Sequence, residues 1–228
     1  MNDFIASFHQ NFIEDSRWQY LVKGLGNTII IALFAVLIGI VLGFVIAIIR
    51  STHDREGRMK ILNTICKVYL TVIRGTPVMV QLLIIYYVVL VSVNNKILVA
   101  VLAFGLNSAA YVAEIMRSGI MSIDPGQFEA GRCLGLNYNQ TMINIILPQA
   151  FKNVLPALAN EFIVLLKETS ISGYIGLMDL TRGGDIIRSQ TWEALMPLLA
   201  VASLYLIMVM LLTYGVGKLE RRLRNNER

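Results

Sequence analysis

Residues 27 to 49 read NTIIIALFAVLIGIVLGFVIAII and contain no charged side chain. About 20 consecutive apolar residues are enough for a helix to cross the hydrocarbon core of a bilayer, so this stretch predicts a membrane span. Lys23 and Arg50 bracket it. Only 15% of the chain is charged and 56% is hydrophobic, whereas about a quarter of a typical soluble domain is charged. The chain is therefore predicted to be an all-α, polytopic membrane protein.

Four further apolar segments predict a total of five spans. They are residues 61–92, 96–118, 142–167 and 194–217. The first of them is amphipathic in its first half and apolar in its second, and RGTP at 74–77 separates the halves, so we interpret it as one interrupted span. Residues 142–167 are only weakly apolar, and such a helix persists in lipid only if protein or a water-lined path covers its polar face. Residues 168–193 are expected to form a loop or short helices.

The distribution of Lys and Arg predicts the orientation of the spans. On one side of the membrane lie the segments 50–60, 117–140 and 217–228. Together they hold eleven Lys and Arg residues, against five in the segments on the other side. The positive-inside rule then places the N-terminus outside and the C-terminus in the cytoplasm of a cell membrane. We ascribe the net charge of +5 to these cytoplasmic segments, and no nucleic-acid partner is expected.

The polar loop at about 119–141, between the third and fourth spans, begins a recognisable pattern. Glu129-Ala130-Gly131 is followed after three residues by Gly135, and nine residues later by Ile145, one residue, and Leu147-Pro148. Asp124-Pro125 is a helix-start signal ahead of it, and Gly135 permits a sharp turn. The spacing resembles the EAA loop of ABC importer permeases, with Gly131 in place of the second alanine.

Three longer blocks extend this resemblance to about residues 20–222. They are RGTPVMVQLLIIYY (74–87), SAAYVAEIMRSGIMSIDPGQFEAGRCLGL (108–136) and LPALANEFIVLLKETSISGYIGL (155–177). They are similar to the polar amino acid uptake subfamily, which includes permeases of the histidine, glutamine and arginine type. The resemblance implies one permease domain over 1–228, with the type I ABC importer permease fold of five transmembrane helices and a cytoplasmic coupling helix.

The same resemblance implies the partners of the chain. The loop at 124–148 is expected to receive the motion of an ATP-binding cassette ATPase subunit. The coupling residues are Glu129, Ala130, Gly131, Gly135 and Leu136. An extracytoplasmic solute-binding protein is expected to deliver the amino acid, and the permease is expected to pair with itself or with a sister chain in the membrane of a bacterium. The identity of the amino acid stays open.

Polar residues inside the predicted spans are candidates for the transport pathway, because burying them in lipid is costly. Glu161 suits the ammonium group of an amino acid, and Asn160 can donate to its carboxylate. Alternatively, Glu161 pairs with a basic neighbour such as Lys167 and only holds helices together. Lys167, Thr169 and Ser170 match the family's Leu-Lys-Asp-Thr-Ser block, with Glu168 in place of Asp. These residues line the outer mouth or cap the helix end.

Two more sets of polar residues lie in the second and third spans. Arg74 and Glu114 are expected near the cytoplasmic ends of their spans, as an inner-gate or structural pair. Tyr111 and Glu114 share one helical face with Asn107, and that face is expected to meet the bundle or the pathway. Gln81 follows the RGTP break and either meets substrate or supports a kink.

Other classes of protein fit the sequence less well. A stand-alone secondary transporter or channel for small solutes would need inverted repeats or a coupling-ion site, and the sequence indicates neither. The sequence has no GxxxxGK[ST] loop, so ATP is expected to bind the partner subunit and not this chain. The two histidines, His9 and His53, lie outside the spans without ligand-like neighbours, so neither a metal site nor a membrane-embedded hydrolase is expected.

Overall fold

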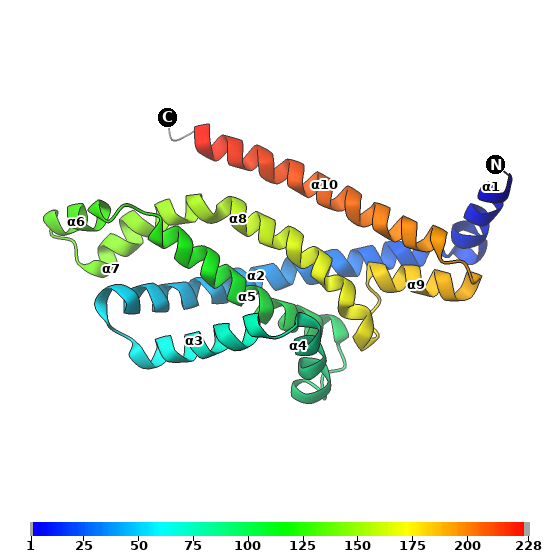
Figure 1. Cartoon of the computed structure of the whole chain (residues 1–228), viewed down its shortest axis with the longest axis horizontal. Coiled ribbons are helices and arrows are strands. Elements are labelled where there is room, and N and C mark those ends of the chain that lie inside the picture. The colour runs from blue at the N-terminus through cyan, green and yellow to red at the C-terminus, as the bar shows by residue number, and fades with distance from the viewer. Residues whose placement is uncertain (1, 226–228) are drawn as a thin grey trace.

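The computed structural model describes residues 2–225, and within that range the chain consists of helices and the turns between them (Figure 1). The α-helices are α1 (Asn2–Phe8), α2 (Trp18–Glu56), α3 (Lys60–Gly75), α4 (Val78–Ile84), α5 (Lys96–Met121), α6 (Gly126–Cys133), α7 (Tyr138–Thr141), α8 (Leu147–Glu168), α9 (Leu180–Thr191) and α10 (Leu195–Asn225). Four helical segments are long and apolar enough to cross a membrane, and the bent pair of α3 and α4 makes up to five. This agrees with the all-α, five-span prediction.

Helices α2 and α5 form the centre of the bundle, and α8 packs against both. Small residues allow the close approach: a Cβ added to Gly39 would lie 2.7 Å from Ser108 Oγ, and one added to Gly43 would lie 2.7 Å from Val112 Cγ1. Such contacts are typical of helix pairs in membranes, where close packing replaces the hydrophobic effect. Helix α2 has 39 residues and is therefore about 58 Å long, so it extends well beyond the predicted span at 27–49 at both ends.

The second predicted span is broken more sharply than its sequence suggested. Helices α3 and α4 meet at an angle of 110°. Thr76 is extended, with φ −123° and ψ 148°, as expected of a residue before proline, and Pro77 cannot donate a backbone hydrogen bond. RGTP therefore ends α3, and α4 leaves the direction of α3 instead of continuing it (Figure 1).

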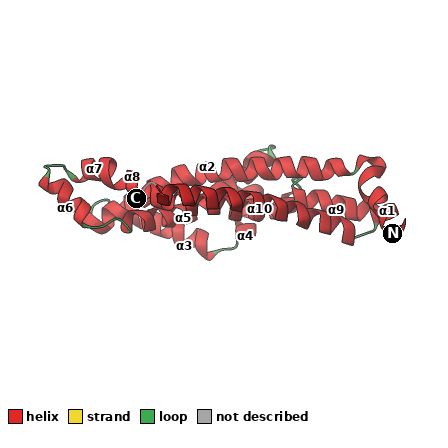
Figure 2. Ribbon diagram, turned by 90° about the horizontal axis from the view of Figure 1, so that it is seen from above, coloured by secondary structure: helices red, strands yellow, loops and turns green. Residues whose placement is uncertain are grey.

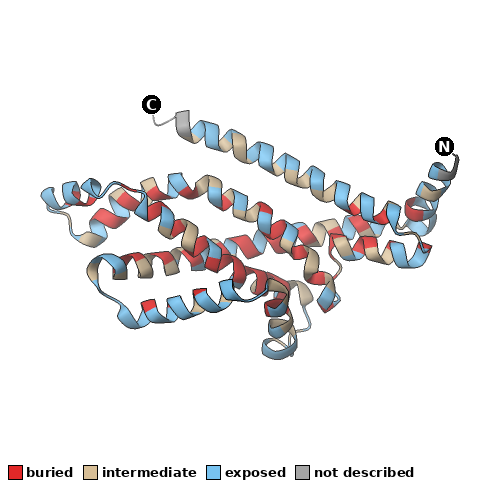
Figure 3. Cartoon of the chain, viewed as in Figure 1, coloured by how far each residue is buried: buried red, intermediate tan, exposed pale blue. Residues whose placement is uncertain are grey.

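The last helix is only loosely attached to the rest. Helix α10 packs against α8 and α9, and Figures 1 and 2 show it returning along the bundle from the α9 end towards the end that carries α6. Only 11% of the residues in its most apolar stretch are buried against the rest of the chain. Figure 3 shows mostly exposed and intermediate residues along the helix. This apolar surface fits contact with lipid. The end of the basic tail, residues 226–228, lies outside the described residues.

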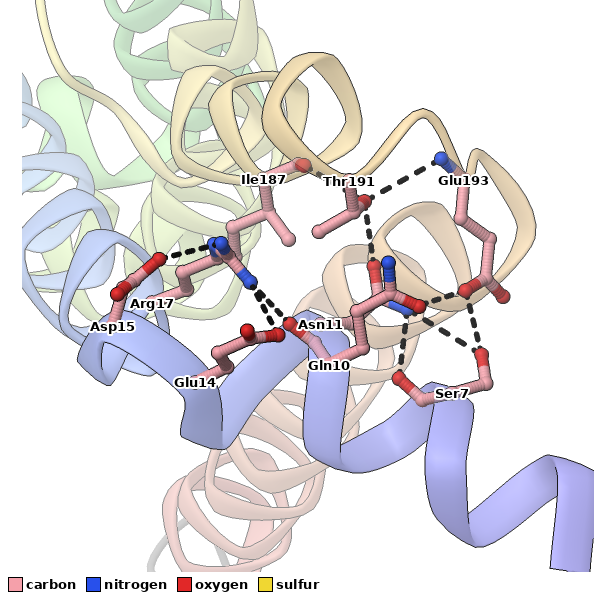
Figure 4. Close-up of polar contacts among 9 residues, drawn as sticks. All are labelled: Ser7, Gln10, Asn11, Glu14, Asp15, Arg17, Ile187, Thr191 and Glu193. Carbon is pink, nitrogen blue, oxygen red and sulfur yellow. Dashed lines mark hydrogen bonds and ion pairs between the residues drawn. The ribbon is translucent and has the colours of Figure 1, made fainter.

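The N-terminal segment docks on the turn between α9 and α10 (Figure 4). Asn11 is fully buried there. Its amide nitrogen donates to Glu193 Oε2 (2.5 Å) and to the carbonyl of Ser7 (2.8 Å), and the Thr191 hydroxyl donates to its amide oxygen (2.8 Å). These bonds satisfy the buried amide, so the segment before α2 is tied to the bundle.

Candidate functional site

A cavity next to the core lies between α5 and α8, with the end of α3 at its rim. Its volume is about 520 Å³. It is lined by Arg74, Tyr111, Glu114, Ile115, Ser118, Gly119, Ser122, Asn153, Val154, Ala157 and Glu161. Four residues selected from the sequence, from three different helices, therefore meet in one place: Arg74, Tyr111, Glu114 and Glu161. A cavity with a carboxylate from α8 and a guanidinium from α3 offers both charges that a zwitterionic ligand needs.

Glu161 is held by α5 and not by its own helix. The Ser108 hydroxyl donates to Glu161 Oε1 at 2.9 Å. Lys167 is exposed, and it makes no ion pair with Glu161. The alternative in which Lys167 neutralises Glu161 is therefore wrong in this structure. One carboxylate oxygen of Glu161 therefore accepts from a neutral donor, and no cation among the described residues forms an ion pair with this side chain.

Arg74 and Glu114 lie together, as predicted, but they are not an isolated pair. Arg74 Nη1 is 3.8 Å from Glu114 Oε2, while Arg50 Nη1 is 3.6 Å from the same oxygen and Arg117 Nε is 3.7 Å from Oε1. One carboxylate on α5 thus serves three guanidinium groups from α2, α3 and α5. The Arg74 guanidinium also lies 5.8 Å from the ring centre of Tyr111.

Arg74 lies where α3 ends. It is in the last turn of the helix, about 21 Å along it from Lys60, because 14 residues at 1.5 Å each separate the two. Arg74 is therefore next to the α3–α4 break. The gate role of Arg74 and Glu114 stays a prediction.

The remaining polar candidates do not line the cavity. Gln81 is buried and stabilises the α3–α4 break. Its amide nitrogen donates to the carbonyls of Ile73 (2.7 Å) and Thr76 (3.0 Å), and Asn107 donates to its amide oxygen (2.9 Å). This geometry favours the kink-supporting role of Gln81. Asn107 faces the bundle, as the face-sharing pattern allowed, while Asn160 is exposed.

The residues expected at the outer mouth are divided between different surroundings. Thr169 is fully buried, and its hydroxyl donates to the carbonyl of Leu166 at 2.8 Å, which caps the end of α8. Ser170 lines a second cavity of about 350 Å³ together with Arg182 and Asp185. Hydrogen bonds from Arg188 hold the pKa of Asp185 below its usual range. Of Lys167, Thr169 and Ser170, Ser170 alone lines either of these two cavities.

The loop with the EAA-like spacing forms a short helix that projects at one end of the bundle (Figure 1). Helix α6 begins after Asp124-Pro125, where Asp124 Oδ1 accepts from the Gly126 N–H at 2.7 Å. It ends at Cys133, and Gly135, directly after the capping residue Leu134, has a φ of +78°. The Leu136 N–H donates to the Gly131 carbonyl and the Gly135 N–H to the Arg132 carbonyl, which is the Schellman pattern of a helix end. The predicted sharp turn at Gly135 is confirmed, because only glycine adopts this φ without strain.

Gly131 has a contact that explains why alanine is absent there. A Cβ added to Gly131 would lie 2.6 Å from Thr141 Oγ1 and 2.7 Å from Thr141 Cγ2. Thr141 belongs to α7, which folds back against α6. Gly131 therefore faces inward, whereas Glu129 and Ala130 are exposed and Leu136 is half-buried. The five predicted coupling residues are thus divided between an exposed face and its support.

A small apolar core fixes α6 to the bundle. Phe128 packs with Ile120, Ile123, Met142 and Ile146. Its ring stacks on Tyr138 at 6.0 Å between centres, and the Arg55 guanidinium from the end of α2 lies 3.8 Å from its ring centre. Packed side chains therefore connect α6 to the end of α2, to the end of α5 and to the start of α8.

Sequence reasoning missed three polar residues that line the α5–α8 cavity, Ser118, Ser122 and Asn153, and it missed Ser108, which donates to Glu161. Ser118 on α5 and Ser122, directly after α5, continue the stripe of Tyr111 and Glu114 at helical spacing, so extension of that stripe by two turns would have found them. Ser108 and Asn153 carry no comparable signal, because their roles depend on how α5 and α8 pack.

The fold and the cavity define a class: a helical membrane permease of the type I ABC importer architecture. The chain belongs to the family of inner membrane components of binding-protein-dependent transport systems, which it matches over residues 39–225. It is 39% identical over 211 residues to the arginine transport system permease protein ArtQ of Bacillus subtilis (strain 168), covering 91% of this chain and 94% of that protein. It is 36% identical over 208 residues to the glutamine transport system permease protein GlnP of Escherichia coli (strain K12), with 90% and 93% covered.

Solved structures agree with this membership. A chain from the crystal structure of an amino acid ABC transporter with histidines is 40% identical, with a TM-score of 0.83, covering 92% of this chain and 98% of that chain. A chain of the MetNI methionine ABC transporter in an inward-facing conformation has a TM-score of 0.79 at 21% identity, over 90% and 97%, and supports the fold alone. The resemblance inferred from the EAA-like loop is confirmed, and the chain is placed among transport permeases and not among enzymes.

Proposed function

We propose that this chain is the transmembrane permease subunit of an ATP-driven importer of amino acids. The names of the relatives, which refer to arginine, glutamine and cystine transport, support this substrate class. The observation that carries the proposal is α6: a short helix with an exposed face, locked from behind by Phe128 and by the Gly131–Thr141 contact. This is the geometry that a docking helix needs to transmit the motion of a separate ATPase subunit.

The α5–α8 cavity is the proposed path of the amino acid. Glu161 binds the ammonium group, and Arg74 provides charged donors for the carboxylate, since both side chains line the cavity. Arg74 takes the role that the sequence suggested for Asn160, which lies outside the cavity. Thr169 and Gln81 have supporting roles in this proposal, Lys167 has none because it is exposed and outside the cavity, and Ser170 belongs to the separate cavity beside α9.

The proposed assembly contains two permease chains, either identical or sister chains, two ATPase subunits and an extracytoplasmic solute-binding protein. We place the α6 end of the bundle in the cytoplasm and the α1 end outside, because the segments near α6 carry the excess of Lys and Arg. ATP binds the partner subunit. The open apolar surface of α10 supports contact with a second chain or with membrane lipid.

Docking through α6 is tested by co-purification. Ala130→Trp adds bulk to the exposed face of α6, and Asn139→Trp adds the same bulk to the exposed surface of α7 as a matched control. We expect the ATPase subunit to co-purify with the wild type and with the control, and to be lost with Ala130→Trp. Equal recovery with both variants would refute docking through α6, and no ATPase with any of the three would favour a stand-alone transporter.

The substrate role is tested by uptake into vesicles that contain the complete complex. Glu161→Gln keeps an acceptor for Ser108 but removes the negative charge, and Lys167→Gln is the control because Lys167 is exposed and outside the cavity. We expect Glu161→Gln to slow uptake of arginine, glutamine or cystine, whichever the complex transports, and the control to leave it unchanged. Unchanged kinetics in Glu161→Gln would remove Glu161 from the path.

The orientation is tested with the two native cysteines. Cys133 is exposed on α6 and Cys66 is buried. A membrane-impermeant maleimide added to intact cells should label Cys133 only after permeabilisation, with Cys133→Ser as the unlabelled control. Labelling of intact cells would place α6 outside and reverse the proposed topology.

A further inference from the structure

A third cavity, which the transport pathway does not use, lies between α2 and α3. Its volume is about 430 Å³, and the residues that line it are Arg50, Lys67, Leu70, Thr71, Arg74 and Gly75. Three of these are cations, and none is a carboxylate. Lys67, Thr71 and Arg74 follow one another at helical spacing, so they present one polar stripe of α3 to Arg50 of α2.

The surroundings leave this cavity with an excess of positive charge. Glu114 is shared by Arg50, Arg74 and Arg117 at 3.6 to 3.8 Å, and Arg117 also meets Asp54 at 3.1 Å. Lys67 makes no ion pair with any described residue. The cavity lining and the ion-pair network of Glu114 together hold four cations and two carboxylates, an excess of positive charge that attracts an anion.

Arg50 provides a second observation that points to an anion. Its side chain is only 16% exposed, and its Nε is buried without a hydrogen-bond acceptor among the described residues. A buried charged donor without an acceptor is costly, and such groups in proteins are normally paired. A ligand oxygen between α2 and α3 would satisfy it.

The depth of the cavity indicates the source of that anion. Arg50 directly follows the uncharged stretch 27–49 and lies six residues, or about 9 Å, before the end of α2. Lys67 lies seven residues, or about 10 Å, after the start of α3. A turn of three residues joins the two helices, so both side chains lie at the same level, at the edge of the hydrocarbon core where lipid phosphates reside.

We propose that this cavity binds the phosphate of an anionic phospholipid in the leaflet on the α6 side. A free amino acid fits poorly, because no carboxylate lines the cavity to receive its ammonium group. Val68 and Val72, next to Lys67 and Thr71 on α3, are exposed and offer an apolar surface to acyl chains. Basic pockets between transmembrane helices on this side of a membrane are suited to anionic headgroups.

The lipid would act on the transport cavity through a shared side chain. Arg74 lines both cavities. A phosphate bound at Arg50 and Lys67 would compete with Glu114 for the guanidinium groups of Arg50 and Arg74. Because Arg74 also lines the α5–α8 cavity, the wall of that cavity would change. The lipid site itself rests on charge and depth and does not depend on the identity of the transported solute.

Native mass spectrometry of the full-length chain, released from nanodiscs of phosphatidylcholine with a minor fraction of phosphatidylglycerol, tests the proposal. Lys67→Gln removes the positive charge of an exposed residue that lines the cavity. Lys60→Gln, on the same helix but outside the cavity, is the matched control. We expect the wild type and the control to retain phosphatidylglycerol over phosphatidylcholine, and Lys67→Gln to lose about fivefold of that preference, the ratio for removal of one basic residue near the surface.

Three results would overturn the proposal. One is equal retention by the wild type and Lys67→Gln, and another is an equal loss in Lys60→Gln, which would indicate diffuse attraction. The third concerns inorganic phosphate added at millimolar concentration to the lipid-free chain. If phosphate binds in a Lys67-dependent way while phosphatidylglycerol is not enriched, the ligand is a soluble anion and the lipid assignment is wrong.

Discussion

Gly131 allows a sharp test of how the coupling helix is built. The Gly131→Ala variant adds a methyl group that would lie 2.6 Å from Thr141 Oγ1 and 2.7 Å from its Cγ2. Thr141 is only 1% exposed, and its hydroxyl donates to the Asn137 carbonyl at 3.1 Å, so the side chain cannot turn away without loss of this bond. Overpacking of this kind costs about 1–3 kcal/mol, whereas alanine in a helix interior gains about 1 kcal/mol over glycine. We therefore expect a net loss of up to about 2 kcal/mol.

The Thr141→Ala background separates the two effects. It removes both atoms that the new methyl group would meet, and the remaining Cβ of residue 141 would lie 3.2 Å away. In this background Gly131→Ala should become neutral or stabilising by up to about 1 kcal/mol, because only the gain in helix propensity remains. The sign of the Gly131→Ala effect thus depends on the side chain at position 141.

The measurement is the thermal unfolding midpoint of the detergent-purified chain, together with hydrogen exchange of the α6 amides, for the wild type, both single variants and the double variant. Gly135→Ala is the control, because nothing lies within 4 Å of its added methyl group and its φ is +78°. It should cost about 1–2 kcal/mol in both backgrounds. If Gly131→Ala has the same effect with and without Thr141→Ala, the close contact does not explain the glycine.

Three further predictions follow from polar groups between the helices. Burial raises the pKa of Asp179 from 3.8 to about 6, so wild-type stability should fall as the pH rises from about 4 to about 6. Asp179→Asn, which keeps the cap of α9, should gain up to about 3 kcal/mol relative to the wild type over that range; parallel curves of melting temperature against pH would contradict this. Gln81→Leu and Asn107→Ala should each cost about 1–3 kcal/mol in thermal stability, and the double variant should cost less than their sum because the two amides bond each other. Glu114→Gln should destabilise the chain more than Arg74→Gln, and the charge-swapped double variant should not recover stability, because it would place a third arginine beside the other two; recovery in a melting experiment would indicate a simple pair.

The sequence was sufficient for features that depend on neighbours along the chain. The uncharged stretch 27–49, the break at RGTP and the turn at Gly135 are local, because chain length, proline and backbone φ decide them. All three were found in the structure. The ends of α2 were not predicted, because the hydropathy of a span gives its length inside the lipid and says nothing of helix that continues into water.

Features that depend on which helix lies opposite were not predictable from spacing. Helical periodicity placed Tyr111 and Glu114 on one face, but it did not show that Arg50 and Arg117 share Glu114 with Arg74. In the same way, the alternative partner considered for Glu161 was Lys167, which is close in sequence, whereas its hydrogen-bond donor Ser108 is 53 residues away. A sequence pattern shows which residues share one face of a helix. Only the packed structure shows which residues of other helices lie against that face.

The sharing of Glu114 has a mechanical consequence. A tight bidentate pair has one favoured geometry, and a shift of its helices by an ångström breaks it. Three guanidinium groups at 3.6 to 3.8 Å from one carboxylate are all slightly long, so a shift that lengthens one contact can shorten another. Helices α2, α3 and α5 can then move past one another at a nearly constant electrostatic energy. A shared carboxylate of this kind keeps its attraction to the guanidinium groups while the helices shift, whereas a single ion pair in its place would hold the helices in one position.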